Sequence, residues 1–365
     1  MSTNRLYFID VVRAFAILMM LQGHFIDTLL DVSYRDESNV FFKCWKYFRG
    51  ITAPTFFTIS GLIFSYLLIK AKHSGNTQQR IKKGLSRGFM LIGIGYLLRV
   101  PLFEWLFGKF NTYFLVIDVL QCIGLSLILI VVIYRLTLKK TLIFSIVMLL
   151  LGLIIFLTEP LYRYLELKNV PTVFSNYLTK ENGSIFTIIP WFGYAAFGAF
   201  IATLFYRYLE RPKFKTAIVS GLFITGLALI YKSSWALMKL YYLTDFELLK
   251  DVAFYNYLFT RLGNVLIMFS LFYLLENYIK QPLILRIGQK TLSIYIIHFI
   301  IIWGSFTGIG LHQLIGKTLL PWQAVIGAML FLTLVCFIAF YYAKTNAFVY
   351  SGITKIIDKI KTYTR

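Results

Sequence analysis

The first apolar run of the sequence carries ionisable side chains whose spacing could do chemistry. Asp10, Arg13 and His24 all fall within 9–25. Arg13 and His24 are eleven residues apart, so on a helix they share one face at a separation of about 16 Å along the axis. A histidine can act as a general base near neutral pH, and an arginine attracts phosphate. This arrangement suits a long substrate with an anionic end and a reactive far end, as in an acyl-CoA.

The same residues also allow a structural interpretation. Asp10 and Arg13 are three residues apart and can pair on one helix face. That pair could simply anchor the helix at a membrane interface, while His24 packs with a satisfied hydrogen bond. We favour a functional role, because ionisable side chains are costly inside a membrane and usually face a cavity or a partner.

Two later apolar runs each hold a pair of polar residues at a spacing of three. Asp118 and Gln121 share a helix face, as do Arg261 and Asn264. We do not expect Asp118 to be charged and unpaired in a membrane. Arg99, Arg261 and the histidines are all candidate partners, and the sequence does not choose among them. A structural ion pair and a substrate-binding role both stay open.

Tyr295 and His298 are also three residues apart and could share a cavity wall. A helix entering near Lys290 would place His298 about 12 Å into the membrane, and the same count places His24 about 24 Å in. We therefore expect that the two histidines need not touch. Trp191 follows a long loop and is either an interface anchor or part of an acceptor pocket.

The composition indicates which elements position these residues. Apolar residues make up 58% of the 365 residues and charged residues 15%, whereas soluble globular chains average nearer 25% charged. We predict an all-α polytopic membrane bundle of about ten transmembrane helices, in a single domain over 1–365. A β-barrel is excluded because the apolar runs are continuous rather than alternating. The runs lie near 6–30, 51–69, 88–106, 114–134, 141–158, 186–205, 216–236, 256–276, 289–308 and 323–343.

The net charge of +21 has a membrane explanation rather than a nucleic-acid one. No zinc pattern, basic heptad or RNA-binding motif is present. Alternate connecting segments hold 22 basic and 3 acidic residues on one side, against 11 and 11 on the other. The excess of Lys and Arg predicts that the first side, with both termini, is cytoplasmic and faces anionic membrane lipids. The C-terminal residues from Lys355 to Arg365 are predicted to rest on the membrane surface.

Five segments, in sequence order, resemble motifs of the transmembrane acyltransferases. The nearest likeness is to the heparan-α-glucosaminide N-acetyltransferase-like branch, with kinship to acyltransferase family 3, and it covers most of the chain. The segments are Asp10-x2-Arg13-x10-His24, APTFFTISG at 53–61, DVLQCIG at 118–124, IPWFG at 189–193 and IGQKTLSIYIIH at 287–298.

The resemblance implies an enzyme that moves an acyl group, often acetyl, from cytoplasmic acyl-CoA to an acceptor. The acceptor would be an amine or hydroxyl of a sugar or glycan, reached from the extracytoplasmic side of a bacterial cytoplasmic (inner) membrane. His24 becomes the catalytic candidate, with Arg13 and Asp10 at the donor. No metal is implied, and the three scattered cysteines indicate none. The remaining candidates, for substrate binding, are Asp118, Gln121, Trp191, Arg261 and His298.

One departure from the family pattern bears on the mechanism. In the lysosomal branch the essential histidine is placed in the loop after the first span, but 28–50 contains no histidine here. The catalytic role therefore moves to His24, and either direct transfer or an acetyl-histidine relay stays open.

Two other function classes compete with the acyltransferase interpretation. The first is a transporter or flippase for a glycan or lipid-linked substrate, and the second is a membrane protein whose charges only hold helices together. A transporter of this kind would show interrupted helices at corresponding positions of two halves, and the sequence shows none. Small-residue faces such as Gly93 with Gly95, or Gly193 with Gly198, could serve a homodimer or internal packing.

Overall fold

The computed structural model describes residues 6–110 and 112–341, and it confirms the all-α prediction for them. The predicted surface segment from Lys355 to Arg365 lies outside these residues. The helices that coincide with the ten predicted runs are α1 (Tyr7–Leu29), α2 (Val40–His73), α3 (Thr77–Arg99), α5 (Val119–Leu136), α6 (Thr141–Leu157), α9 (Ile188–Tyr208), α10 (Phe214–Tyr231), α13 (Tyr257–Leu274), α16 (Thr291–Trp303) and an unlabelled last helix, Pro321–Tyr341. Shorter helices connect them: α4 (Leu102–Leu106), α7 (Glu159–Tyr162), α8 (Thr172–Leu178), α11 (Ser233–Thr244), α12 (Glu247–Phe254), α14 (Glu276–Ile279), α15 (Pro282–Gln289) and α17 (Leu311–Leu314).

The described helices form a transmembrane bundle. Seven of them are long and apolar enough to cross a membrane, and the bent pair of α15 with α16 would make an eighth. Helix α6 is apolar but has only 17 residues, and α3 carries four basic residues in its first half. The count of ten spans therefore remains a prediction.

Several helix ends differ from the predicted runs. Helix α3 stops at Arg99, so the run near 88–106 is not one helix. Pro101 explains this, because proline lacks a backbone N–H and restricts the residue before it. Helix α5 starts at Val119 rather than near 114, since Asp118 caps its first turn.

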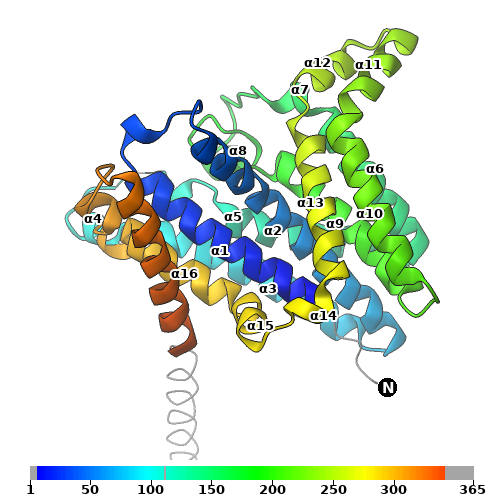
Figure 1. Ribbon diagram of the computed structural model, residues 1–365, viewed down its shortest axis with the longest axis horizontal. Coiled ribbons are helices and arrows are strands. Elements are labelled where there is room, and N and C mark those ends of the chain that lie inside the picture. Colours follow the sequence, from blue (N-terminus) through cyan, green and yellow to red (C-terminus); the bar gives the residue numbers. More distant parts are fainter. Residues whose placement is uncertain (1–5, 111, 342–365) are drawn as a thin grey trace, which may run out of the picture.

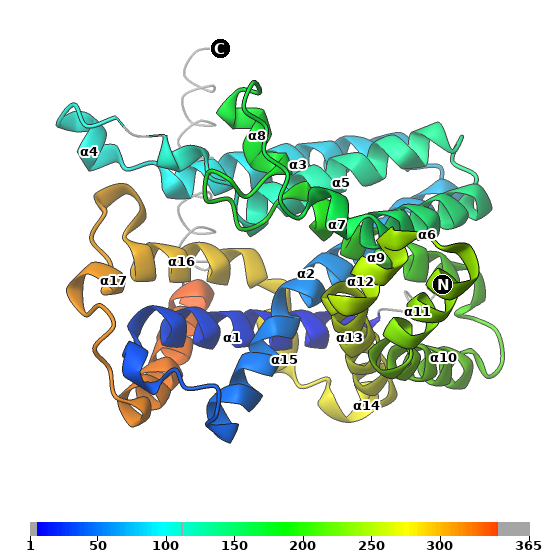
Figure 2. The same ribbon diagram turned by 90° about the horizontal axis from the view of Figure 1, so that it is seen from above.

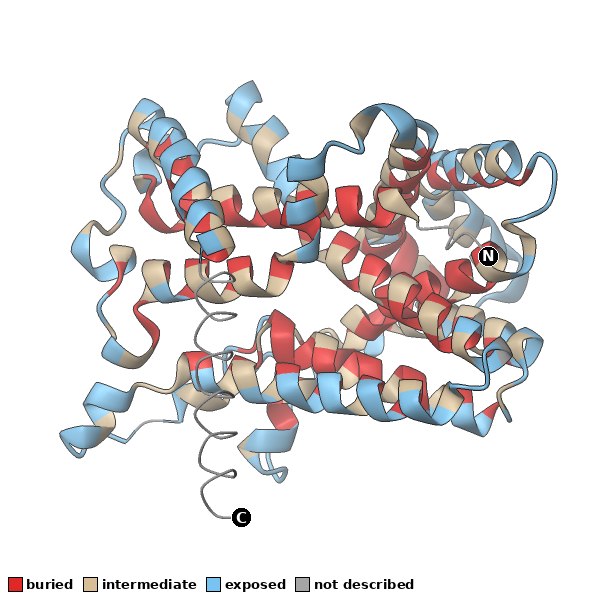
Figure 3. Ribbon diagram, turned by 90° about the horizontal axis from the view of Figure 1, so that it is seen from below, coloured by how far each residue is buried: buried red, intermediate tan, exposed pale blue. Residues whose placement is uncertain are grey.

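The centre of the bundle is the pair of α2 and α9. A Cβ on Gly61 would lie 2.0 Å from the carbonyl oxygen of Ala195, and one on Gly198 would lie 1.9 Å from that of Thr58. Only glycine allows the two backbones to approach so closely. In the most apolar 18-residue stretch of α9, 78% of the residues are buried, against 22% in α10 at the edge of the bundle. Figure 3 shows the buried residues on the inward faces of the helices.

Helices α15 and α16 are bent by 70° at Lys290. Gly288 of α15 packs directly on the backbone of Asp10, where a Cβ would lie 1.9 Å from the carbonyl oxygen. This contact brings the start of α16 beside α1. The pair of α15 and α16 is the one bent pair found in the described ranges, so no second interrupted helix matches it at a corresponding position there.

The connecting segments gather at opposite ends of the bundle. Helices α7, α8, α11 and α12 lie along the upper edge of Figure 1, and α14 and α15 lie along its lower edge with the N-terminus. Figure 2 shows α3 beside α5, with α16 lying between them and α1. Which side of the membrane each end faces remains a prediction.

Candidate active site

A cavity of about 900 Å³ lies between α1, α2, α3, α5 and α16, and we call it the central cavity. Its wall is largely apolar, with side chains such as Ile17, Phe56 and Leu120. One end is strongly basic, on the side predicted to be cytoplasmic. The cations that line it are Arg13, Arg80, Lys82, Lys83 and Arg87.

Arg13 is fixed at the wall of the central cavity by two neighbours. Its Nη2 donates a 2.7 Å hydrogen bond to Thr291 Oγ1 at the start of α16. Its Nη1 lies 3.7 Å from Asp10 Oδ1, so the pairing expected from the spacing of three does form. A guanidinium has five N–H donors, and these contacts leave others available to an anionic ligand.

The two membrane histidines lie against each other. The rings of His24 and His298 stack with centroids 5.5 Å apart and an interplanar angle of 26°. The expectation that they need not touch is therefore wrong. The predicted depths of the two histidines were counted from the points where their helices enter the membrane. That count did not include the bend before α16, which determines where α16 starts relative to α1. Trp303 closes the pair, with its ring edge-on to His24 at 5.1 Å.

His298 is the more isolated of the two rings. It is fully buried, and neither Nδ1 nor Nε2 has a hydrogen-bond partner within the described part of the chain. The carbonyls of Ile294 and Tyr295 lie beside the ring but outside hydrogen-bond geometry. A buried unpaired polar group is costly, so an imidazole in this state is suited to a ligand or a proton.

Asp118 connects the histidines to a buried arginine. Its Oδ2 accepts a 2.9 Å hydrogen bond from Arg99 Nη2, which identifies Arg99, rather than Arg261, as its partner. Its carboxylate also contacts the hydroxyl of Tyr295, a side chain that lines the central cavity. The ring of Tyr295 in turn meets His298 edge-on at 4.9 Å. A charged pair is thereby coupled through Tyr295 to the stacked histidines.

Gln121 belongs to the cap of α5. Its side-chain oxygen accepts a 3.2 Å hydrogen bond from the backbone N–H of Asp118, and together they form a capping box. Its amide nitrogen is buried without a partner in the described residues, and Gly95 provides the space for the side chain. Gln121 is not among the residues that line the central cavity.

Arg261 lies in a separate hollow of about 350 Å³ between α2 and α13, which we call the α2–α13 pocket. Lys43 and Lys46 line the same space, on the side predicted to be extracytoplasmic. Arg49, next along α2, packs against Gly23 and forms an ion pair with Asp27. Arg49 therefore lies beside Gly23, the residue that precedes His24 on α1, and Gly50, which follows Arg49 on α2, lines the α2–α13 pocket.

Trp191 packs away from both histidines. Its ring lies 5.1 Å from Phe57, 4.9 Å from Phe186 and 5.8 Å from Tyr194, between ring centroids. It lines neither the central cavity nor the α2–α13 pocket. The structure thus places it in an aromatic cluster at the start of α9.

The basic residues of α3 were missed as candidates, because 70–87 was treated as a connecting loop. In the structure, α3 begins at Thr77 and carries them along the central cavity. A signal was present: Arg80, Lys83 and Arg87 follow the spacing i, i+3, i+7 of a single helix face.

The arrangement combines two chemical capabilities. The basic end can hold several phosphates. The stacked imidazoles, about 16 Å from Arg13 along α1, can accept and return a proton. Within the described ranges, no three His, Cys, Asp or Glu side chains gather as metal ligands would.

Comparison with known proteins identifies the family of the chain. A search of curated proteins finds no match. A family model for the catalytic region of heparan-alpha-glucosaminide N-acetyltransferase matches residues 5–244. The matched region includes Arg13, His24 and Asp118 and ends before α13 and α16. Kinship to acyltransferase family 3 remains a prediction. Since the matched region spans more than half of the 365 residues, the chain belongs to the heparan-alpha-glucosaminide N-acetyltransferase catalytic family and is a transmembrane acetyltransferase.

Proposed function

We propose that this protein transfers an acetyl group from cytoplasmic acetyl-CoA to an amine or hydroxyl of a sugar or glycan reached from the other side of the membrane. The observation that carries the proposal is the central cavity. It joins five cations at one end to Tyr295, and through Tyr295 to the stacked histidines, at the other.

The basic end of the central cavity suits the phosphates of CoA. Arg13 is already oriented by Asp10 and Thr291, so little side-chain entropy is lost when it binds an anion. The apolar wall beyond it accommodates an extended pantetheine arm. Arg13 and His24 are about 16 Å apart along α1, which lets the thioester reach the histidines while the phosphates stay at the mouth.

The stacked histidines provide acid–base chemistry for the transfer. His24 accepts the proton of the acceptor amine or hydroxyl as that group attacks the thioester carbonyl carbon. The carbon–sulfur bond breaks, and the imidazolium returns the proton to the departing CoA thiolate. Two rings in contact do not both become charged, because like charges repel, so the pair holds one proton at a time. An acetyl-histidine relay uses the same residues.

We assign the acceptor to the opposite side, at the α2–α13 pocket. Arg261, Lys43 and Lys46 would bind polar groups of a glycan there. Access to His24 then requires movement of the Arg49–Asp27 pair. Trp191 is assigned to supporting the start of α9 rather than to direct contact with the acceptor.

A transporter or flippase remains the second candidate, and the α15–α16 bend is the observation that favours it. The bend lies at the wall of the central cavity, where such interruptions coordinate substrates. Membership of an acetyltransferase family weighs against it.

The test is release of free CoA thiol by the purified protein with acetyl-CoA and glucosamine as the amine acceptor. Wild-type protein should release CoA in proportion to acetylated product. His24→Ala should abolish release, while His312→Ala, which removes an exposed histidine, should not. Full release by His24→Ala would overturn the catalytic assignment and make His298 the next candidate. Absence of acetyl transfer in wild type, with uptake of a lipid-linked sugar into vesicles, would favour the transporter.

A further inference from the structure

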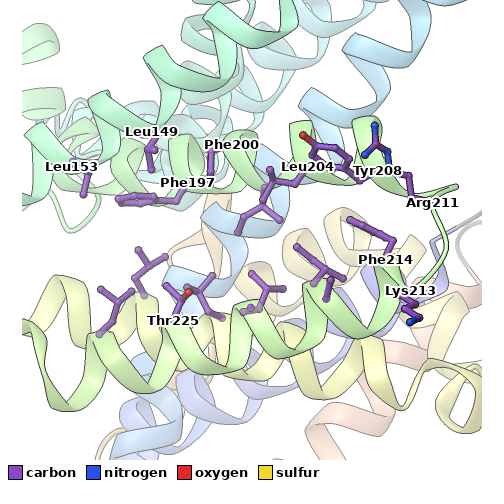
Figure 4. A pocket seen from close by; sticks show the side chains of 18 of the residues that line it. Leu149, Leu153, Phe197, Phe200, Leu204, Tyr208, Arg211, Lys213, Phe214 and Thr225 are labelled. Atoms are coloured by element: carbon purple, nitrogen blue, oxygen red, sulfur yellow. The ribbon is translucent and has the colours of Figure 1, made fainter.

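A second large cavity lies outside the candidate site, and we call it the apolar crevice. It has a volume of about 670 Å³ and separates the pair α6 and α9 from the pair α10 and α13. Figure 4 shows its two walls facing each other, with Phe197 and Leu204 of α9 on one side and Thr225 of α10 on the other. None of the residues of the central cavity lines it.

The walls of the apolar crevice come from two helix pairs that are each tightly packed. Helices α10 and α13 touch through Gly226 and Gly263, where a Cβ on either would lie within 3 Å of the other helix's backbone. Gly221, which lines the crevice, has nothing within 4 Å of its Cβ position. The crevice is therefore a gap between rigid units rather than loose packing of one unit. An empty apolar space of this size would sacrifice dispersion contacts on all sides, so an apolar occupant is expected.

One end of the crevice is cationic. Arg211 and Lys213 line it at the turn between α9 and α10 (Figure 4). The guanidinium of Arg211 lies 4.9 Å from the ring centroid of Tyr208, and neither cation has a carboxylate partner within the described part of the chain. The segment 207–215 contains four basic residues against the single acid Glu210. An anionic group at this end would meet complementary charge.

We propose that the apolar crevice binds one anionic phospholipid, with its phosphate between Arg211 and Lys213 and an acyl chain between α9 and α10. From Phe214 to Leu229 the lined face of α10 extends about 22 Å, enough for one extended acyl chain. A basic pocket between transmembrane helices is a recognised kind of anionic-lipid site. The proposal does not rest on the acetyltransferase chemistry, because the two cavities share no residue.

The test compares phosphatidylglycerol with phosphatidylcholine on the detergent-purified, delipidated full chain. Native mass spectrometry should show one retained phosphatidylglycerol, and thermal stability should rise with that lipid more than with phosphatidylcholine. The variant Arg211→Gln/Lys213→Gln should bind phosphatidylglycerol about thirtyfold more weakly, as expected for two surface cations of this kind. The variant Arg135→Gln/Lys140→Gln removes the same charge from an exposed turn elsewhere and should leave binding unchanged.

A second variant tests the acyl-chain part of the site. Gly221→Phe should fill the open space and prevent retention of the lipid without removing any charge. Size-exclusion elution and acetyl-CoA-induced stabilisation report whether this variant is folded. Equal binding of the two lipids, or equal loss in both double-glutamine variants, would overturn the proposal. Displacement of the lipid by a long-chain acyl-CoA at equal concentration would also overturn it, since the crevice would then be a second acyl-CoA site.

Discussion

The central cavity and the apolar crevice are built alike at one end and differently at the other. Both are long apolar spaces between helices, and both have cations at the end that we predict to be cytoplasmic. The central cavity also has a polar far end, formed by Tyr295 with His298 and His24 behind it. The far end of the crevice is lined by apolar side chains, among them Leu153, Phe197, Leu229 and Phe259. Binding of an anionic amphiphile needs only the shared features, whereas a reaction needs the polar far end, so substitutions there should affect turnover most.

The largest effect is expected for His24→Ala. Loss of a positioned general base costs about 10²- to 10⁴-fold in rate, so kcat should fall by that factor while acetyl-CoA still binds. Steady-state kinetics together with calorimetric binding of acetyl-CoA would measure the two parts. His312→Ala is the matched control. If kcat were unchanged in His24→Ala, His24 would not be what makes the central cavity, unlike the apolar crevice, a site of reaction.

The next effect concerns the ion pair behind Tyr295. Asp118→Asn leaves Arg99 without its carboxylate, and breaking a buried pair typically costs about 3 kcal/mol of stability. Chemical unfolding in mixed micelles would show the loss. The double variant Arg99→Gln/Asp118→Asn should recover part of it, because no unpaired charge remains. Equal stability of Asp118→Asn and wild type would mean that the pair does not support the polar end.

Arg13→Ala should act mainly on donor binding. A hydrogen bond to a charged group contributes about 1.5–3 kcal/mol, so the Kd for acetyl-CoA should rise by about tenfold to a hundredfold. The change should appear in KM more than in kcat. Arg135→Ala, at an exposed position outside the cavity, provides the comparison for general charge loss. An effect confined to kcat would place Arg13 at the reaction rather than at the phosphates.

The smallest effect is expected for single neutralisations of the α3 face. Lys82→Gln or Lys83→Gln removes one of several cations. Both lysines are exposed, and exposed charges contribute up to about 1 kcal/mol each. Donor affinity should fall severalfold at low salt, and the difference from wild type should shrink as ionic strength rises. A salt-independent loss would indicate a specific contact instead of a diffuse basic mouth.

Residue spacing within single helices predicted part of the candidate site, but it could not predict the contacts between helices. The stagger of Arg13 and His24 and the Asp10–Arg13 pair follow from helix geometry alone. The contact of His24 with His298 depends on the α15–α16 bend and on Gly288 against α1, which are tertiary features.

Two other features of the site show where sequence patterns fail for physical reasons. The sequence offered Asp118 several possible cationic partners. Only the packing of α3 on α5 shows that Arg99 is the one that pairs with it. The α3 cations were assigned to a loop because they interrupt the apolar run. Helix α3 has a charged half that lines the basic end of the central cavity and an apolar half within the membrane. Hydropathy alone assigns the charged half to a loop and only the apolar half to a membrane span.

Thermal stability of the purified protein with and without acetyl-CoA tests the central claim most directly. The claim is that one cavity binds the donor at Arg13 and delivers it to His24. Wild type and His24→Ala should both be stabilised by saturating acetyl-CoA, by about 2.7 kcal/mol at a hundred times Kd, and Arg13→Ala should lose most of that shift. His24→Ala should bind the donor without appreciable CoA release, whereas Arg13→Ala should release CoA once the acetyl-CoA concentration is raised above its larger KM. Absence of a shift in wild type with acetyl-CoA, or a full shift in Arg13→Ala, would contradict the account.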